Sequence, residues 1–292
     1  MEHVATLSHR GRRRRKNEDC VLAAQLADDA LLLAVADGVG GERAGEVASR
    51  DAVRLIEEQM TAPHDGSPGE RLAAAIRHAN GIVWQRGQQA AHLHGMATTV
   101  VAGFVQGGRA WLANVGDSRA YLIHKGEIVR VTQDHSLVAE RVREGNLTEE
   151  EARQSRVRHI ITRSVGSGAE LEVDLFGPLE LAPETTLLLC SDGLYEVVGD
   201  GEILAAVTDA SPVEAAHRLV DLANERGGPD NISVVVYRET GRSEPGRARQ
   251  AEGTLDPPGR YTIAGITTSS GSWPQVAAAM RHSGVAQVEV AQ

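Results

Sequence analysis

The sequence has little cysteine, few aromatic residues and no long apolar run. Its two cysteines, Cys20 and Cys190, are too few for a disulfide framework or a cysteine-based zinc site, and they fit a reducing compartment. No apolar run approaches the roughly 18 residues of a membrane helix, and the first residues lack the apolar core of a signal peptide. We therefore expect a cytoplasmic protein without a membrane partner. Because aromatic residues are only 3% of the 292 residues, the core has to be aliphatic.

Basic residues are also fewer than acidic ones. The formal net charge of −10 argues against a nucleic-acid partner, because such proteins normally carry a basic surface. Hydrophobic residues at 41% and charged residues at 24% are typical of soluble globular proteins. A second interpretation of the acidic charge is that some carboxylates converge on metal ions.

Several apolar runs of strand length adjoin an aspartate. The runs are 31–36 before Asp37, 110–115 before Asp117, 187–190 before Asp192, and 232–237 after Asp230. A single Asp-Gly pair is explained as a turn. If these strand ends meet, however, two carboxylates about 4 Å apart repel by about 4 kcal/mol at an effective dielectric of 20. A cluster therefore implies bound cations or raised pKa values, and cations are the simpler answer.

Segments with helical periodicity alternate with these runs. Apolar stripes indicate helices over 44–56, 72–83 and 213–223. The last has Ser211 as N-cap, Pro212 at the first helical position and Glu214 completing a capping box. Residues 100–132 are typical of consecutive antiparallel strands joined by glycine turns. Central strands with helices on both sides predict a layered α+β sandwich.

The composition changes after Tyr237. Residues 239–260 are polar and rich in Gly, Pro and Arg, which is typical of a linker. We place a folded domain at 1–238 and a C-terminal extension of unknown role at 261–292. The extension has an alternating run at 261–266, a helix expected around 274–281 and a final run at 285–290. It is too small to fold alone, so we expect it to pack on the main domain or to be partly disordered.

Oxygen ligands from carboxylates, a backbone carbonyl and water suit Mg²⁺ or Mn²⁺, and the sequence lacks the Cys or paired-His spacing that zinc prefers. Gly38 is a candidate carbonyl ligand, since a residue without a side chain lets the backbone approach an ion. Two such metals can activate a water for attack on phosphorus. The basic run 12–16 is either a solvated face or contains an arginine that holds two phosphate oxygens.

An ordered set of motifs carries a resemblance to a known family. The motifs are RRKNED from Arg14, VADGVGG from Val35, GERAGEVAS from Gly41, ATT from Ala97, NVGDSRAY from Asn114, DHS from Asp134, LLLCSDGL from Leu187 and GPDNISVVV from Gly228. Together they resemble the metal-dependent protein phosphatases of type 2C, particularly the compact bacterial ones. The resemblance implies a four-layer α-β-β-α sandwich with two central, mainly antiparallel sheets and a binuclear Mn²⁺ or Mg²⁺ centre at one end.

The resemblance also implies a set of metal ligands. Asp37 would bridge both metals, and the carbonyl of Gly38 would bind one of them. Asp192 and Asp230 would complete the second metal site. Asp117 corresponds to the ligand of a third, weaker metal in bacterial relatives.

Two residues are implied as catalytic. Asp19 would orient metal-bound water, and Arg14 stands at the family's phosphate-binding position. The polar segment 135–168 stands where the family carries a mobile flap that selects substrates, although ordinary surface helices remain an alternative. His159 lies where this flap is expected to approach the third metal.

The sequence departs from the family pattern at a few positions. Glu42 replaces a usual His, Ala97 a usual Gly and Glu196 a common Asp, while Val39 stands where eukaryotic members have His. None is an implied core metal ligand, so we expect activity to survive with altered metal affinity. The leaving-group acid is left unassigned.

The resemblance implies hydrolysis of phosphoserine and phosphothreonine on proteins, in opposition to a cytoplasmic kinase, by a monomer that takes part in signal transduction. The main alternative is a pseudophosphatase, a module that binds phosphorylated partners without turnover. Another is a relative that dephosphorylates a partner-switching regulator. A nucleotide site is not supported, because VADGVGG lacks the Lys-Ser/Thr of a P-loop and the Rossmann spacing.

Overall fold

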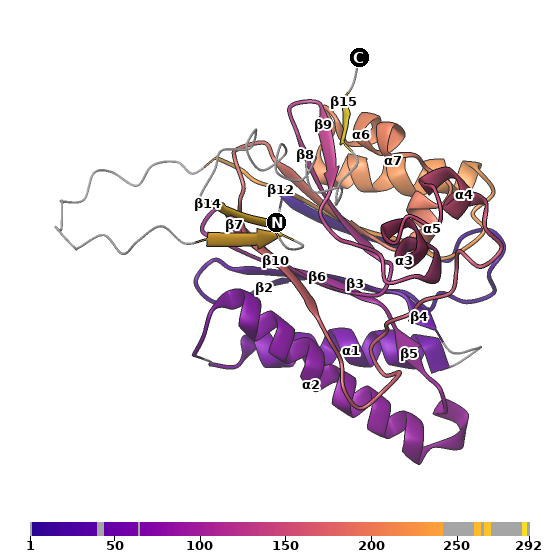
Figure 1. Cartoon of the computed structure of the whole chain (residues 1–292). Coiled ribbons are helices and arrows are strands. Elements are labelled where there is room, and N and C mark those ends of the chain that lie inside the picture. The colour runs from indigo at the N-terminus through magenta and orange to yellow at the C-terminus, as the bar shows by residue number, and fades with distance from the viewer. Residues whose placement is uncertain are drawn as a thin grey trace.

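The protein is described by a computed structural model over residues 2–39, 44–63 and 65–241, together with the backbone of three short strands between residues 260 and 290. Two β-sheets lie face to face, and helices cover the outer face of each (Figure 1). All paired strands are antiparallel. The predicted α+β fold, a four-layer α-β-β-α sandwich, is confirmed.

The first sheet has the strand order β10-β7-β6-β3-β2 and the second the order β1-β12-β11-β8-β9-β15. The strands of the first are β2 (Cys20–Gln25), β3 (Leu31–Ala36), β6 (Val100–Gln106), β7 (Arg109–Val115) and β10 (Asp174–Glu180). Those of the second are β1 (Val4–His9), β8 (Arg119–His124), β9 (Glu127–Arg130), β11 (Thr186–Cys190), β12 (Ile232–Arg238) and β15 (Val288–Val290). A separate pair joins β4 (Gly38–Val39) to β5 (Ala97–Thr98). All four apolar runs that adjoin an aspartate are therefore strands of the two main sheets.

The helices form the outer layers. Helices α1 (Ala44–Thr61) and α2 (Pro68–Gln89) cover the first sheet, and α6 (Asp200–Val207) and α7 (Pro212–Glu225) cover the second (Figure 1). The shorter helices are η1 (Ala91–Leu93), α3 (Leu137–Arg143), α4 (Glu149–Gln154) and α5 (Asp192–Tyr195). The predicted capping box of α7 is present, since the Ser211 hydroxyl accepts from the Glu214 N–H and the Glu214 carboxylate accepts from the Ser211 N–H at 2.9 Å.

Aliphatic side chains fill the spaces between the layers. Successive residues of a strand point to opposite faces of its sheet, so Leu32 packs toward α1 and α2 while Leu33 packs against the second sheet. Both leucines are inaccessible to solvent. A strand buried on both faces needs an unbroken apolar run, which explains why β3 reads LLLAVA.

The C-terminal extension contributes three strands to the described backbone. Strands β13 (Arg260–Ile263) and β14 (Ile266–Ser269) pair with each other, and β15 pairs with the edge strand β9. Residues 242–259 of the expected linker and the helix expected around 274–281 lie outside the described residues. The division at 238 and 260 stays a proposal. Within the described residues, no helix is both long and apolar enough to cross a membrane.

Candidate active site

Antiparallel pairing gathers the predicted aspartates at one end of the sheets. Strand β2 begins where β3 ends, with Cys20 opposite Ala36, so Asp19 and Asp37 are brought together. Strand β12 likewise begins beside the end of β11, which brings Asp230 toward Asp192. Asp117 follows β7 and belongs to the same group. Electrostatic repulsion from all four other aspartates, Asp117 included, acts on Asp37.

Burial and mutual repulsion raise the pKa values of these carboxyl groups. Burial raises the pKa of Asp37 and Asp192 well above the ordinary value, and repulsion from neighbouring aspartates raises both further. Burial also raises the pKa of Asp19 to about 6, against the opposing effect of a hydrogen bond from Ser191. For Asp117, burial and then repulsion raise the pKa to about 7. If all of these carboxyl groups are ionised, bound positive charge has to offset their mutual repulsion.

The residues present fit divalent cations. Oδ1 of Asp19, Oδ1 of Asp192 and Oε1 of Glu18 are buried without a hydrogen-bond partner within the described part of the chain. A buried carboxylate oxygen without a partner is costly, and a metal ion or a water held by one would satisfy it. The backbone of Gly38 also lies close to that of Gly45, since a Cβ at Gly38 would lie 2.2 Å from the carbonyl oxygen of Gly45. The donors are all oxygen, as Mg²⁺ and Mn²⁺ prefer.

The backbone of Asp37 is held in place by two threonines. The Asp37 N–H donates to Thr99 Oγ1 at 2.9 Å, and the Asp37 carbonyl accepts from Thr98 Oγ1 and from the Thr99 N–H, both at 2.8 Å. Ala97, the departure from the family pattern, pairs with Val39 and makes none of these bonds. The ATT motif therefore positions the aspartate through its two hydroxyl residues.

Arg14 lies at the edge of the aspartate cluster. Its guanidinium donates to Oδ2 of Asp230 at 2.6 Å and is also attracted by Asp37 and Asp192. The Arg14 side chain is 50% exposed, so a group that binds at the edge of the cluster can reach it. The residue expected to bind phosphate thus directly contacts a residue expected to bind metal.

Asn231 has a structural role that the sequence analysis does not assign. Its Nδ2 donates to the carbonyl oxygens of Arg10 and Lys16, at 2.9 and 2.8 Å, and its Oδ1 accepts from the Glu18 N–H at 2.8 Å. One amide therefore closes both ends of the loop before β2. Its position directly after Asp230 was the only signal in the sequence.

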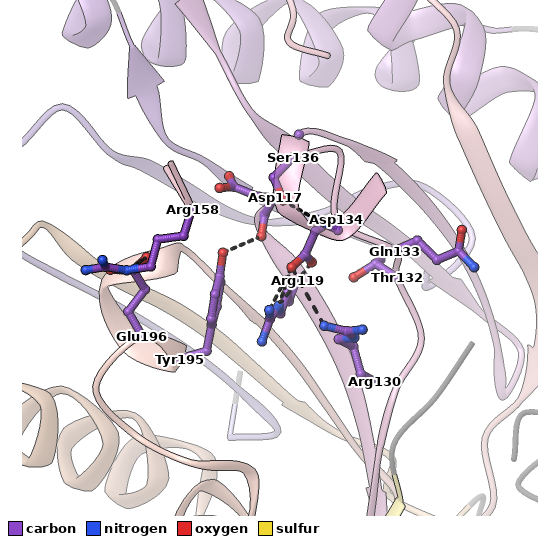
Figure 2. Close-up of polar contacts among 12 residues, drawn as sticks. Asp117, Arg119, Arg130, Thr132, Gln133, Asp134, Ser136, Arg158, Tyr195 and Glu196 are labelled. Carbon is purple, nitrogen blue, oxygen red and sulfur yellow. Dashed lines mark hydrogen bonds and ion pairs between the residues drawn. The ribbon is translucent and has the colours of Figure 1, made fainter. Parts of the chain in front are cut away.

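A cavity of about 700 Å³ adjoins Asp117 and is lined by residues of α3 and α4 and by residues 195–200. Figure 2 shows the polar residues around it. The Tyr195 hydroxyl donates to the Asp117 carbonyl at 3.0 Å, and the guanidinium of Arg119 lies 3.5 Å from the centre of the tyrosine ring. Arg119 also makes paired hydrogen bonds to Asp134. Burial alone would raise the pKa of Asp134, but Arg119 and Arg130 hold it below the usual range.

The expected flap segment reaches the site. Its short helices α3 and α4 are followed by His159, whose Nδ1 lies 3.1 Å from Oε1 of Glu196. Together with Asp192, these residues offer three ligand atoms within 4.8 Å of one another. His159 thus lies near a predicted metal ligand, although its role stays a prediction. Glu42 lies outside the described residues.

Comparisons with known proteins point to one family. The family model described as protein phosphatase 2C matches residues 8–225. The chain is 41% identical over 236 residues to the serine/threonine protein phosphatase PstP of Mycobacterium tuberculosis, covering 80% of this chain and 44% of that protein. It is 36% identical over 239 residues to the serine/threonine phosphatase stp of Listeria welshimeri, covering 80% and 94% of the two chains.

A solved structure indicates the same family. The catalytic domain of the serine/threonine protein phosphatase PstP, solved in complex with two manganese ions, matches with a TM-score of 0.72 and 37% identity, covering 82% of this chain and 98% of that one. The chain spans less than half the length of the mycobacterial relative, but nearly the whole length of the listerial protein. From the matched residues and the shared fold, the chain belongs to the protein phosphatase 2C family.

Proposed function

We propose that this protein is a metal-dependent phosphatase that hydrolyses phosphoserine and phosphothreonine esters on proteins. The observation that carries the proposal is the convergence of Asp19, Asp37, Asp117, Asp192 and Asp230 at one end of the two sheets. Five buried or half-buried carboxylates with one contacting arginine form a site for cations, and the arginine adds a site for a phosphoryl group. Phosphate monoesters are among the slowest substrates to hydrolyse unaided, so this combination matches a phosphatase.

The proposed metal ligands are Asp37, the Gly38 carbonyl, Asp192 and Asp230 for two core ions, and Asp117 for a third. When bound, Mn²⁺ or Mg²⁺ supplies positive charge beside the phosphoryl oxygens and lowers the pKa of water. The manganese ions in the PstP catalytic domain support this choice of metal. The all-oxygen donor set of this chain supports it independently.

The protein's own side chains then orient the reactants. Arg14 is half-exposed at the cluster edge, where its guanidinium would bind two oxygens of a phosphomonoester. Asp19 accepts from the Ser191 hydroxyl through Oδ2, which leaves Oδ1 to accept a hydrogen bond from the attacking water and so to orient it.

The proposal also covers the substrates, the opposing enzyme, the oligomeric state and the location of the protein. We infer phosphorylated proteins as substrates, a serine/threonine kinase as the opposing enzyme, and a monomer acting in the cytoplasm. The names of the relatives support the substrate class, and the two unpaired cysteines support a reducing compartment.

The test is hydrolysis of a phosphothreonine peptide by the purified protein with Mn²⁺, with chelator, and with the variant Asp37→Asn. We expect metal-dependent turnover that falls by at least a hundredfold in the variant, since Asp37 is proposed to bridge both metals. Asp221→Asn, an isosteric change at an exposed residue of α7, is the matched control and should retain full activity.

Absence of turnover in a folded protein that binds Mn²⁺ would reject the enzymatic proposal. The pseudophosphatase alternative would then take its place. Isothermal titration with Mn²⁺ and with a phosphothreonine peptide separates that outcome from simple loss of the metal site.

A further inference from the structure

The loop between β1 and β2 is strongly basic in a protein whose net charge is −10. Residues 10–16 read RGRRRRK, and the side chains of Arg12, Arg13 and Arg15 are exposed. None of these three makes an ion pair within the described residues. We call residues 10–16 the basic loop. The function of Arg14 leaves the charges on either side of it unexplained.

The basic loop is held firmly by its backbone. The N–H groups of Arg12 and Arg13 donate to the Gly228 carbonyl at 2.8 and 3.2 Å, and Asn231 binds the carbonyls at both ends of the loop. A Cβ at Gly11 would lie 2.0 Å from the Asp230 carbonyl oxygen, so the two backbones are in direct contact. The exposed arginines therefore project from an ordered base, which lowers the entropy cost of binding.

The basic loop is continuous with the proposed catalytic centre. Arg14 lies in the middle of it and donates to Asp230 at 2.6 Å. Arg13 and Arg15 are the immediate sequence neighbours of Arg14, each with its Cα atom about 3.8 Å from that of Arg14. Exposed charges act over roughly one Debye length, about 10 Å at 0.1 M salt, so these two arginines would attract acidic groups beside a phosphoryl group that Arg14 binds.

Given the proposed phosphatase function, on which this inference rests, we propose that Arg12, Arg13 and Arg15 form a docking surface for acidic residues that flank the phosphorylated residue of a substrate protein. Aspartate, glutamate and a second phosphorylated residue share the required chemistry. A membrane or nucleic-acid partner is less well matched, because the patch adjoins a cluster of carboxylates and the rest of the chain is acidic.

The test compares two phosphothreonine peptides that differ only in having glutamate or glutamine on both sides of the phosphothreonine. The double variant Arg13→Ser/Arg15→Ser is compared with Arg77→Ser/Arg218→Ser, which removes the same charge from exposed positions on α2 and α7. Hydrolysis of p-nitrophenyl phosphate with Mn²⁺ reports whether the catalytic centre is intact in each protein. Peptide hydrolysis is measured as kcat/KM at low and high salt.

We expect the unmodified protein to prefer the glutamate peptide, and the loop variant to lose about fivefold of that preference, the size typical of two exposed ion pairs. High salt should reduce the preference similarly. An unchanged preference, or equal losses in both variants, would overturn the inference. So would Arg13- and Arg15-dependent binding to phosphatidylserine vesicles with no effect on peptide preference.

Failure of the phosphatase proposal is recognised separately. In that case no protein hydrolyses p-nitrophenyl phosphate or either peptide. Fluorescence anisotropy of the labelled peptides needs no turnover, and it then decides the inference. Selective loss of glutamate-peptide binding in the loop variant supports the docking surface, and equal binding by both variants rejects it.

Discussion

Replacing Asp19 by asparagine should stabilise the metal-free protein at neutral and alkaline pH. Burial raises the pKa of Asp19 from 3.8 to about 6. Below pH 3.8 the carboxyl is protonated in both the folded and the unfolded states, so burial carries no charge penalty. Between these pKa values the unfolded state loses its proton first, and the stability of the unmodified protein falls as pH rises. Above pH 6 the full penalty, about 3 kcal/mol, applies.

The substitution removes that penalty while keeping the local hydrogen bond, because an amide oxygen can still accept from the Ser191 hydroxyl. We expect Asp19→Asn to raise the free energy of unfolding by up to about 3 kcal/mol at pH 8 and by roughly half as much at pH 5. Urea unfolding in the presence of chelator measures both values. Adding Mn²⁺ should reverse the order, since ligand binding stabilises the folded state and the unmodified site binds more tightly.

Asp221→Asn again provides the control, since this exposed residue of α7 should leave the free energy of unfolding unchanged at both pH values. The reasoning is refuted if Asp19→Asn gives no stabilisation in chelator, or if its gain is the same at pH 5 and pH 8. Either result would mean that burial does not raise the pKa of Asp19 in the folded protein.

Three further substitutions test a close backbone contact at the site, a hydrogen bond at the site and the N-cap of α7. Gly193→Ala would place a Cβ 2.0 Å from the Asn231 carbonyl oxygen, so we expect a loss of several kcal/mol in urea unfolding together with loss of phosphatase activity. Tyr195→Phe removes the hydrogen bond to the Asp117 carbonyl and should cost about 1 kcal/mol, with weaker binding of the third metal ion in a Mn²⁺ titration. Ser211→Ala removes the N-cap of α7 and should cost about 1 kcal/mol in urea unfolding, without altering peptide hydrolysis.

The features predicted correctly from the sequence are those with strong local patterns. The run LLLAVA followed by Asp37 predicts a strand that ends in a carboxylate, and β3 ends at Ala36. The capping box at Ser211 is likewise encoded within a few residues, so it could be predicted without knowledge of the fold. The convergence of the aspartates was a conditional prediction, because periodicity does not specify which strands pair.

Other features depend on contacts that no local pattern records. The amide of Asn231 reaches Arg10 across 221 positions, and the Tyr195 hydroxyl reaches Asp117 across 78. The cavity beside Asp117 exists only once α3 and α4 have packed near α5. Sequence reasoning therefore identified the candidate chemical groups, whereas the positioning of those groups emerged from the tertiary structure.

The attachment of both ends of the basic loop to Asn231 has a consequence for how specificity can diversify. Each end is bound through a backbone carbonyl, so the side chains of Arg12, Arg13 and Arg15 take no part in the attachment and can be exchanged. The length of the loop is constrained, because an inserted or deleted residue would move the carbonyl of Arg10 or Lys16 away from the side-chain amide of Asn231. Homologues and engineered variants can therefore change substrate preference by substitution at constant length, whereas a transplanted loop of another length would also disturb the strand end that carries Asp230.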